Sequence, residues 1–340
     1  MANVLLTGGT GFIGSRTLRY ALEKGYHVRA TVRSEAKAQE LKLRLSQHSD
    51  KLETIIVPDI LAPGAFDKAV EGVEFVVHVA SPLPSGTLND DQEALTVQPS
   101  IRGTTGILES SQKPGTVKRV VITSSLVAVV PLGILAGIQS PGDKVYTAED
   151  RAPDVPKPYP NVFAAYIQSK IAAQKASDAW MAEHKPSFDL INIQPSFVGG
   201  VSDIAKKSAD LLEGTNPYFL APIRGKDASA AVGAQVANFV DVDDVAKAHI
   251  EALNSSVKGN QDFVLTNKGG DEAWNDAKAV VSKHFPETVG KLWPNDGSIE
   301  PHFFAPVDIE KTEATFGKLN GLDKIVEKLV RQYVELAEKE

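Results

Sequence analysis

The feature that most constrains this chain is a glycine-rich turn that directly follows a short apolar run. It reads Thr7-Gly8-Gly9-Thr10-Gly11-Phe12-Ile13-Gly14 and lies between a predicted strand and a predicted helix. In such a unit the first glycine permits the tight turn, the second lets a phosphate approach the backbone, and the third lets helix and strand pack closely. The helix N-terminus favours an anion at the same place. The turn therefore predicts a dinucleotide site formed by Gly8, Thr10, Gly11, Phe12, Ile13 and Gly14.

Short β-branched runs alternate with helical patterns over the first two-thirds of the chain, as in βαβ units. We expect strands at Val4–Thr7, His27–Val32, Glu53–Val57, Phe75–Val79, Val117–Thr123 and Phe188–Gln194, and helices at Phe12–Glu23, Glu35–Ser46, Glu93–Ser111 and Tyr166–Glu183. This order predicts an α/β fold with a doubly wound parallel sheet (Rossmann fold) and a smaller C-terminal lobe. Ligands are expected at the carboxyl ends of the strands.

The alternating pattern ends near Pro195, where Gly and Pro residues divide the chain into shorter elements. We expect a dinucleotide-binding domain at 1–195, to which 236–266 and an amphipathic C-terminal stretch at 322–340 return. The segments 196–235 and 267–321 are expected to form a substrate-binding lobe. In the returning segment, Asp243 or Asp244 is the expected N-cap of a helix.

Composition and charge exclude several functions. The chain has 43 acidic and 36 basic residues, and a net charge of −7 gives no attraction to nucleic acid or anionic membranes. It has no cysteine, and its histidines show no close pairing, so we expect no metal site. The uncharged stretch 120–138 is interrupted by Pro131 and by glycines, and is read as a strand and a loop rather than a membrane span. No secretory leader is expected, and the predicted location is cytoplasmic.

The end of the second predicted strand indicates the cofactor. The sequence there is Thr31-Val32-Arg33-Ser34, and it lacks the carboxylate that would bind the ribose 2′-hydroxyl of NAD. Arg33, with Lys37 one helical turn further on, supplies cations that suit a 2′-phosphate. We therefore expect the cofactor to be NADP(H).

Three polar residues form a candidate catalytic set. Tyr166 and Lys170 are spaced to share one face of a helix, and Ser125 follows the fifth predicted strand, at the same sheet edge as the glycine turn. A phenol with a pKa of ~10 exchanges protons poorly near neutrality unless a nearby cation lowers that pKa. We expect Tyr166 to exchange a proton with a carbonyl oxygen, Lys170 to lower the pKa of Tyr166, and Ser125 to donate to the oxyanion.

These motifs resemble those of the short-chain dehydrogenase/reductase superfamily, in its extended, NAD-dependent epimerase/dehydratase-like branch. Within that branch the chain looks most similar to yeast and fungal NADPH-dependent aldehyde and ketone reductases, of the carbonyl and methylglyoxal reductase type, and to plant dihydroflavonol reductases. The resemblance rests on the glycine spacing, on Ser125, Tyr166 and Lys170, and on the segments Val77-His78-Val79-Ala80-Ser81-Pro82 and Gln194-Pro195-Ser196-Phe197-Val198.

The resemblance also implies site residues. It implies cofactor contacts at Asp59, Ile60, Ala80, Ser81, Tyr166, Pro195 and Val198, and a hydrogen bond from Lys170 to the nicotinamide ribose. One departure is Ser100, where many extended members carry Asn.

The expected activity is NADPH-dependent reduction of a ketone or aldehyde to a chiral alcohol, by a monomer or homodimer. The apolar stretch after Ser125 predicts a hydrophobic substrate pocket lined by Leu126, Val130, Phe163 and Phe197, although the same stretch could equally be core.

Two other functions remain open. One is a nucleotide-sugar epimerase or dehydratase with tightly bound NAD, which Val32-Arg33 disfavours, as does Leu126-Val127 where dehydratases carry an acid pair. The other is a non-catalytic NADP-sensing protein on the same fold.

Overall fold

The chain forms two compact units. A computed structural model describes residues 3–82, 86–87, 89–268, 273–300 and 302–340. The first unit comprises 1–132, 148–194 and 246–263, and the second comprises 133–147, 195–245 and 264–340.

A parallel sheet is the frame of the first unit. In the described part of the chain it has seven strands in the order β10-β6-β5-β4-β1-β2-β3. The strands are β1 (Asn3–Thr7), β2 (His27–Val32), β3 (Leu52–Ile56), β4 (Phe75–His78), β5 (Arg119–Thr123), β6 (Asp189–Pro195) and β10 (Gln261–Leu265). From β3 to β6 all neighbours pair in parallel. The strand order reverses between β1 and β4, and a doubly wound sheet binds its ligand at such a point.

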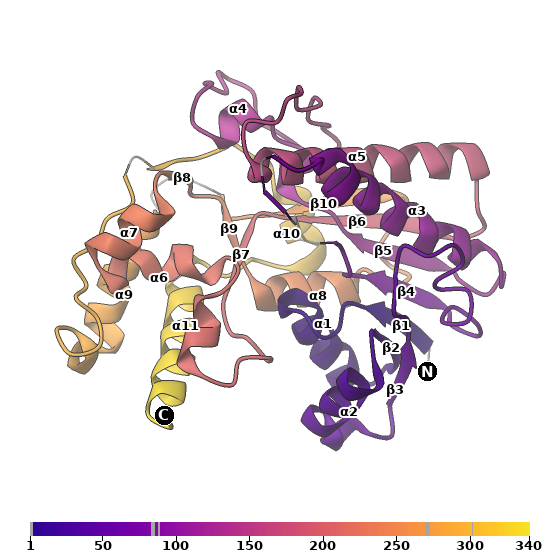
Figure 1. Cartoon of the computed structure of the whole chain (residues 1–340), viewed down its shortest axis with the longest axis horizontal. Helices are drawn as coiled ribbons and strands as arrows, with labels where there is room; N and C mark the ends of the chain where they lie inside the picture. Colours follow the sequence, from indigo (N-terminus) through magenta and orange to yellow (C-terminus); the bar gives the residue numbers. More distant parts are fainter. Residues whose placement is uncertain (1–2, 83–85, 88, 269–272, 301) are drawn as a thin grey trace. The chain divides into compact units, whose positions relative to one another are not determined.

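The doubly wound prediction is confirmed, and so are its six expected strands. The helices of this unit are α1 (Phe12–Glu23), α2 (Glu35–Arg44), α3 (Gln98–Gln112), α5 (Val162–His184) and α8 (Val242–Glu251), which continues into it from the second unit. Figure 1 shows α3 and α5 on one face of the sheet and α1 and α8 on the other. Alternating apolar residues of the strands, such as Val76 and Val120, meet helix residues such as Ile107 in the core between these layers.

Two helices begin at other residues than expected, for local reasons. Asn161 caps α5, since its Oδ1 accepts a hydrogen bond from the Ala164 amide at 2.8 Å, so the helix begins at Val162 rather than at Tyr166. The first turns of the helix expected at Glu93–Ser111 form a π-helical segment, Glu93–Val97, before α3 begins.

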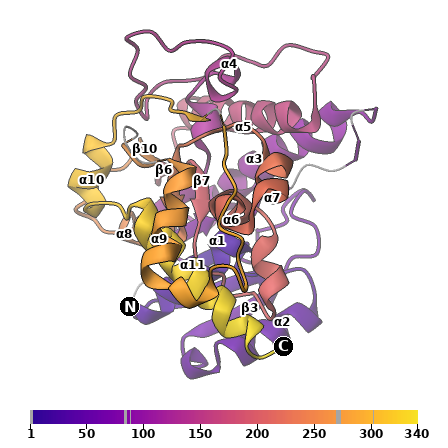
Figure 2. The same cartoon turned by 90° about the vertical axis from the view of Figure 1, so that its left-hand side faces the viewer.

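The second unit is built around aromatic residues. Its elements are α4 (Leu132–Leu135), β7 (Phe197–Gly199), α6 (Asn216–Arg224), α7 (Lys226–Val232), β8 (Gln235–Val236), β9 (Phe239–Asp241), α9 (Ala277–His284), β11 (His302–Phe303), α10 (Glu310–Phe316) and α11 (Leu322–Ala337). Trp274 is fully buried, and its ring lies 5.0 Å from that of Phe219 and 5.5 Å from that of Phe239. Figure 2 shows α9 and α11 of this unit side by side.

The C-terminal helix lies in a different unit from the one we expected. Residues 322–340 were predicted to return to the dinucleotide-binding domain, but α11 belongs to the second unit. Its buried residues, among them Ile325 and Leu329, share an apolar cluster with Trp274 and Trp293. Hydrophobic periodicity identifies a buried helix face but does not say which core covers it.

The returning segment is also shorter than expected, because 236–245 and 264–266 lie in the second unit and only 246–263 returns. Residues 133–147 join the second unit as well, where the Tyr146 amide donates to the Pro306 carbonyl at 2.8 Å.

The N-cap prediction at Asp243 or Asp244 was wrong by a few residues. Both lie inside the first turn of α8, and the Oδ1 of Asp241 accepts from the Asp243 amide at 3.0 Å. Lys328 of α11 bonds both Asp241 and Asp243. The acidic run therefore joins α8 to α11 within the second unit.

No helix among the described residues is long and apolar enough to cross a membrane.

Candidate functional site

The parallel register brings the predicted site residues of the first unit to one edge of the sheet. The glycine turn follows β1, Arg33 follows β2, Asp59 follows β3, Ala80 follows β4 and Ser125 follows β5. All five segments leave the carboxyl ends of adjacent strands, which is the ligand edge of this architecture.

The glycine turn has little room for side chains at two of its positions. Gly8 has φ +79°, and a Cβ there would lie 2.7 Å from the Ala80 amide nitrogen. A Cβ on Gly14 would lie 2.0 Å from the Gly8 carbonyl oxygen. Both glycines are therefore required by the fold itself.

Gly11 differs, since a Cβ there would meet only the Gly8 carbonyl oxygen, at an ordinary 3.5 Å. It is exposed, and it is the N-cap of α1, which has no side-chain cap and no acidic residue in its first turn. The packing of the protein does not require glycine at this position, whereas close approach by a phosphate does. A dinucleotide pyrophosphate thus fits this turn.

Two cations lie beyond β2. Arg33 is exposed and, among the described residues, has no ion pair, while Lys37 on α2 pairs with Glu40 at 2.8 Å. Beyond β3, the Asp59 carboxylate accepts from the Leu61 amide at 2.8 Å, which shapes the turn that also holds Ile60. Arg33 is thus the cation most accessible to a 2′-phosphate.

Ser125 and Tyr166 are brought together from different elements. Ser125 follows β5, and its Oγ accepts from the Val127 amide at 3.4 Å in a short 3₁₀ turn. Tyr166 comes from the second turn of α5, and its phenol is hydrogen-bonded to the Ser125 side chain. The two hydroxyls can therefore bind one carbonyl oxygen together.

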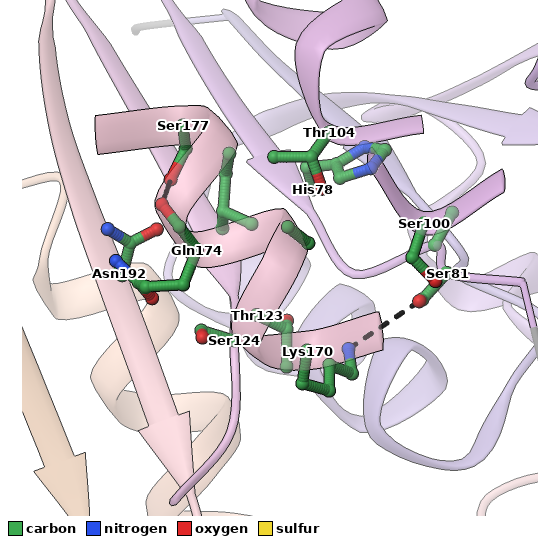
Figure 3. Close-up of a pocket in the computed structure, with 13 residues that line it drawn as sticks. His78, Ser81, Ser100, Thr104, Thr123, Ser124, Lys170, Gln174, Ser177 and Asn192 are labelled. Atoms are coloured by element: carbon green, nitrogen blue, oxygen red, sulfur yellow. Dashed lines mark hydrogen bonds between the residues drawn. The ribbon is translucent and has the colours of Figure 1, made fainter. Parts of the chain in front are cut away.

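Lys170 is buried one turn further along α5. Its Nζ donates to Ser81 Oγ at a long 3.5 Å. Figure 3 marks this hydrogen bond with a dashed line. Burial lowers the pKa of the amine from 10.5 to about 8. A buried ammonium with a hydroxyl beside it is suited to bind further hydroxyl groups, such as those of a ribose.

The expected lowering of the Tyr166 pKa is not seen in this structure. Burial raises the pKa of the phenol above 10, and the hydrogen bond with Ser125 opposes that only in part. Lys170 is not among the groups that act on this pKa. Desolvation therefore outweighs the neighbouring groups, and the phenol keeps its proton near neutral pH.

A small polar cavity of about 20 Å³ lies beside Lys170. Its lining includes His78, Ser100, Gln174 and Asn192, seen in Figure 3, and a cavity this size holds a water molecule. Gln174 Oε1 is buried and has no hydrogen-bond partner within the described part of the chain, so it would accept from such a water. Sequence reasoning used His78 only as part of a family motif and Ser100 only as a departure from one, and it gave Gln174 and Asn192 no role. The one signal at Gln174 and Asn192 was a polar side chain at a position that periodicity assigns to the core.

The predicted substrate residues differ in accessibility. Leu126 and Val130 are 1% and 0% exposed, whereas Phe163 is 49% exposed and its ring is stacked on that of Tyr166, 5.9 Å away. Phe197 is half-buried in β7. That these four residues line a pocket stays a prediction, as do the cofactor contacts of Pro195 and Val198.

Among the described residues, no group of three or more His, Asp or Glu side chains could hold a metal ion. The expected absence of a metal stays a prediction.

Comparison with known proteins gives consistent matches. The sequence pattern of the "NAD dependent epimerase/dehydratase family" matches residues 4–265. The chain is 39% identical to the ketoreductase CTB6 of Cercospora nicotianae, covering 99% of this chain and 96% of the relative. It is 34% identical to the ketoreductase azaE of Aspergillus niger, covering 86% and 85%. The solved structure of Gre2 from Candida albicans in complex with NADPH matches with a TM-score of 0.79 at 26% identity, covering 99% of both chains.

The buried amine of Lys170 should reduce the stability of the chain. With a pKa near 8 when folded and 10.5 as its ordinary value, the folded state bears the full cost of the buried charge below pH 8. This cost decreases as the pH rises from about 8 to 10.5, and it is absent at higher pH. At ~1.4 kcal/mol for each tenfold change in proton affinity it is about 3 kcal/mol at pH 7.

We therefore expect Lys170→Met to raise the free energy of unfolding at pH 7 by up to about 3 kcal/mol. The gain should disappear toward pH 10.5. Urea denaturation followed by circular dichroism measures it, with Lys175→Met on the exposed side of α5 as the control. A destabilised Lys170→Met chain at pH 7 would contradict the assigned cost.

Proposed function

The chain belongs to the NAD dependent epimerase/dehydratase family, and on that basis we propose that it is an NADPH-dependent carbonyl reductase acting on hydrophobic ketones or aldehydes. The observation that carries the proposal is the pairing of the Ser125 and Tyr166 hydroxyls at the carboxyl edge, one helical turn from the buried Lys170. The relatives named ketoreductases support the reaction class.

The proposed mechanism assigns one task to each residue. Ser125 donates a hydrogen bond to the carbonyl oxygen and Tyr166 donates its proton to it, so that the oxygen becomes a hydroxyl. NADPH, when bound, supplies the hydride that the carbonyl carbon gains. Lys170 binds the ribose hydroxyls, and the Tyr166 phenolate regains a proton from solvent. The raised pKa of Tyr166 suits the reductive direction, since it keeps the phenol protonated before reaction.

We propose NADPH rather than NADH as the cofactor because the Arg33 side chain is accessible to a 2′-phosphate. Its exposed guanidinium follows β2, where a dinucleotide ribose is bound in this architecture. The match to a reductase solved with NADPH supports the same choice.

We propose a hydrophobic substrate because the ring of Phe163 is stacked on that of Tyr166. An exposed aromatic ring beside the proton donor offers an apolar surface next to the reacting carbonyl. Leu126 and Val130 are buried under their neighbours, so they would shape this region without direct contact with the substrate. The cytoplasmic location and the monomeric or homodimeric state remain part of the proposal.

The first test is turnover. NADPH oxidation is followed by absorbance with a panel of ketones, ketoesters and aldehydes, and we expect Tyr166→Phe to lower kcat by about 10²–10⁴-fold. Tyr26→Phe, which precedes β2 at the opposite edge of the sheet, is the control. No turnover by the wild type despite NADPH binding would favour a sensor, and NAD retained through purification would favour an epimerase or dehydratase.

The second test is cofactor preference. Loss of a charge-assisted contact of ~1.5–3 kcal/mol should lower the NADPH-to-NADH ratio of kcat/KM by about 10–100-fold in Arg33→Ala. Arg102→Ala, exposed on α3, is the control. An unchanged ratio would place the 2′-phosphate elsewhere.

The third test is substrate selection. Phe163→Ala should lower the ratio of kcat/KM for aryl ketones to that for small aliphatic aldehydes by about 5-fold, because an aromatic contact of ~0.5–1.5 kcal/mol is lost. Leu43→Ala, exposed on α2, should leave the ratio unchanged. An equal loss of kcat/KM for both groups of substrates would show that Phe163 does not line the pocket.

A further inference from the structure

Thr7 and His78 form a buried polar contact at the strand-order reversal. They are the last residues of β1 and β4, they are register partners, and their side chains are 0% and 3% exposed. Thr7 Oγ1 lies 2.9 Å from His78 Nδ1, and the same oxygen accepts from the Ala80 amide at 3.1 Å. One buried hydroxyl thus joins both strand ends.

The direction of the contact follows from counting protons. The Ala80 amide uses one acceptor position of the Thr7 oxygen, and within the described residues the hydroxyl proton has no recorded acceptor other than His78 Nδ1. Thr7 therefore donates to Nδ1, and the proton of the neutral imidazole is on Nε2. His78 accepts the hydroxyl proton, and this orients a lone pair of the Thr7 oxygen toward the Ala80 amide.

The imidazole is held in the neutral form that this role needs. Burial, and then the charge of Lys170, lower the pKa of His78 to about 3. The Phe66 ring packs edge-on against the imidazole at 5.7 Å. The hydrogen-bonded arrangement is therefore kept over the whole range of pH in which the protein would work.

The Thr7 hydroxyl binds Ala80, which lies between two parts of the proposed cofactor site, the glycine turn and the Ser81–Lys170 pair. Gly8 is tightly packed on Ala80, since a Cβ on Gly8 would be 2.7 Å from the Ala80 nitrogen. The next residue, Ser81, accepts from Lys170, and His78 and Ser81 line the same cavity as Lys170 (Figure 3). A shift of Ala80 would therefore change the spacing between the glycine turn and the Ser81–Lys170 pair.

We propose that His78 is a positioning residue for the dinucleotide, which acts through the Thr7 hydroxyl to hold Ala80 between the pyrophosphate turn and Lys170. This inference rests on the proposed function only in that NADPH is the ligand. No contact between His78 and the cofactor is involved. The contribution is a fixed spacing between two binding regions that the ligand must span.

Equilibrium binding of NADPH tests the proposal without turnover. We expect His78→Phe and Thr7→Val each to raise the Kd by about 10-fold, as for a lost buried hydrogen bond. The double variant should lose little more than either single one, because both act through one contact. Thr7→Ser and His78→Asn, which keep a donor and an acceptor at these places, should retain most of the affinity.

Binding of adenosine 2′,5′-bisphosphate distinguishes a loss of positioning from a general loss of the folded site. This ligand carries the 2′-phosphate but lacks the nicotinamide half, so it should bind the wild type, the four single variants and the double variant equally. Equal weakening of both ligands, or additive losses in the double variant, would overturn the positioning role and leave the proposed function intact. Absence of NADPH binding by the wild type would overturn both.

Discussion

The approach of Gly14 to the Gly8 carbonyl is the constraint on which the site depends. No side chain fits between these backbones, so the four-residue turn that joins β1 to α1 is tightly packed at the point where the strand order reverses between β1 and β4. The parallel register then brings the ends of five strands to that place. The catalytic candidates Ser125, Tyr166 and Lys170 are positioned by the end of β5 and by α5, so regular secondary structure holds the residues that would perform the reaction.

Burial decides the electrostatics of this edge. It lowers the pKa values of Lys170 and His78 and raises that of Tyr166, and in each case it is the largest cause. All three groups are pushed toward their neutral forms, as expected where water is excluded. The protein alone therefore presents a proton donor and an uncharged imidazole, and only the lysine retains a charge near neutral pH.

The sequence predicted the features that depend on local patterns. The six strands, α1, the glycine turn and the residues at the strand ends are specified by short-range periodicity and by special residues, and the structure contains them. It did not predict the unit to which α11 belongs, because the apolar face of α11 could cover either core. The raised pKa of Tyr166 was also missed, since a motif shows which residues are neighbours but not how much water reaches them. The Thr7–His78 contact depends on the pairing of β1 with β4, which is non-local.

The Lys37–Glu40 ion pair has a consequence for how cofactor preference can change. A 2′-phosphate that approaches Lys37 replaces one anionic partner with another, so the gain at this residue is only the difference between two exposed ion pairs, each worth ~0–1 kcal/mol. Discrimination between NADPH and NADH then depends mainly on Arg33, because Arg33 forms no ion pair with a carboxylate among the described residues. Both cations are exposed and lie outside the packed core, so substitutions there cost little stability. Evolution could therefore retune the choice between the two nicotinamide cofactors through a few surface positions, without disturbing the buried residues that perform the reaction.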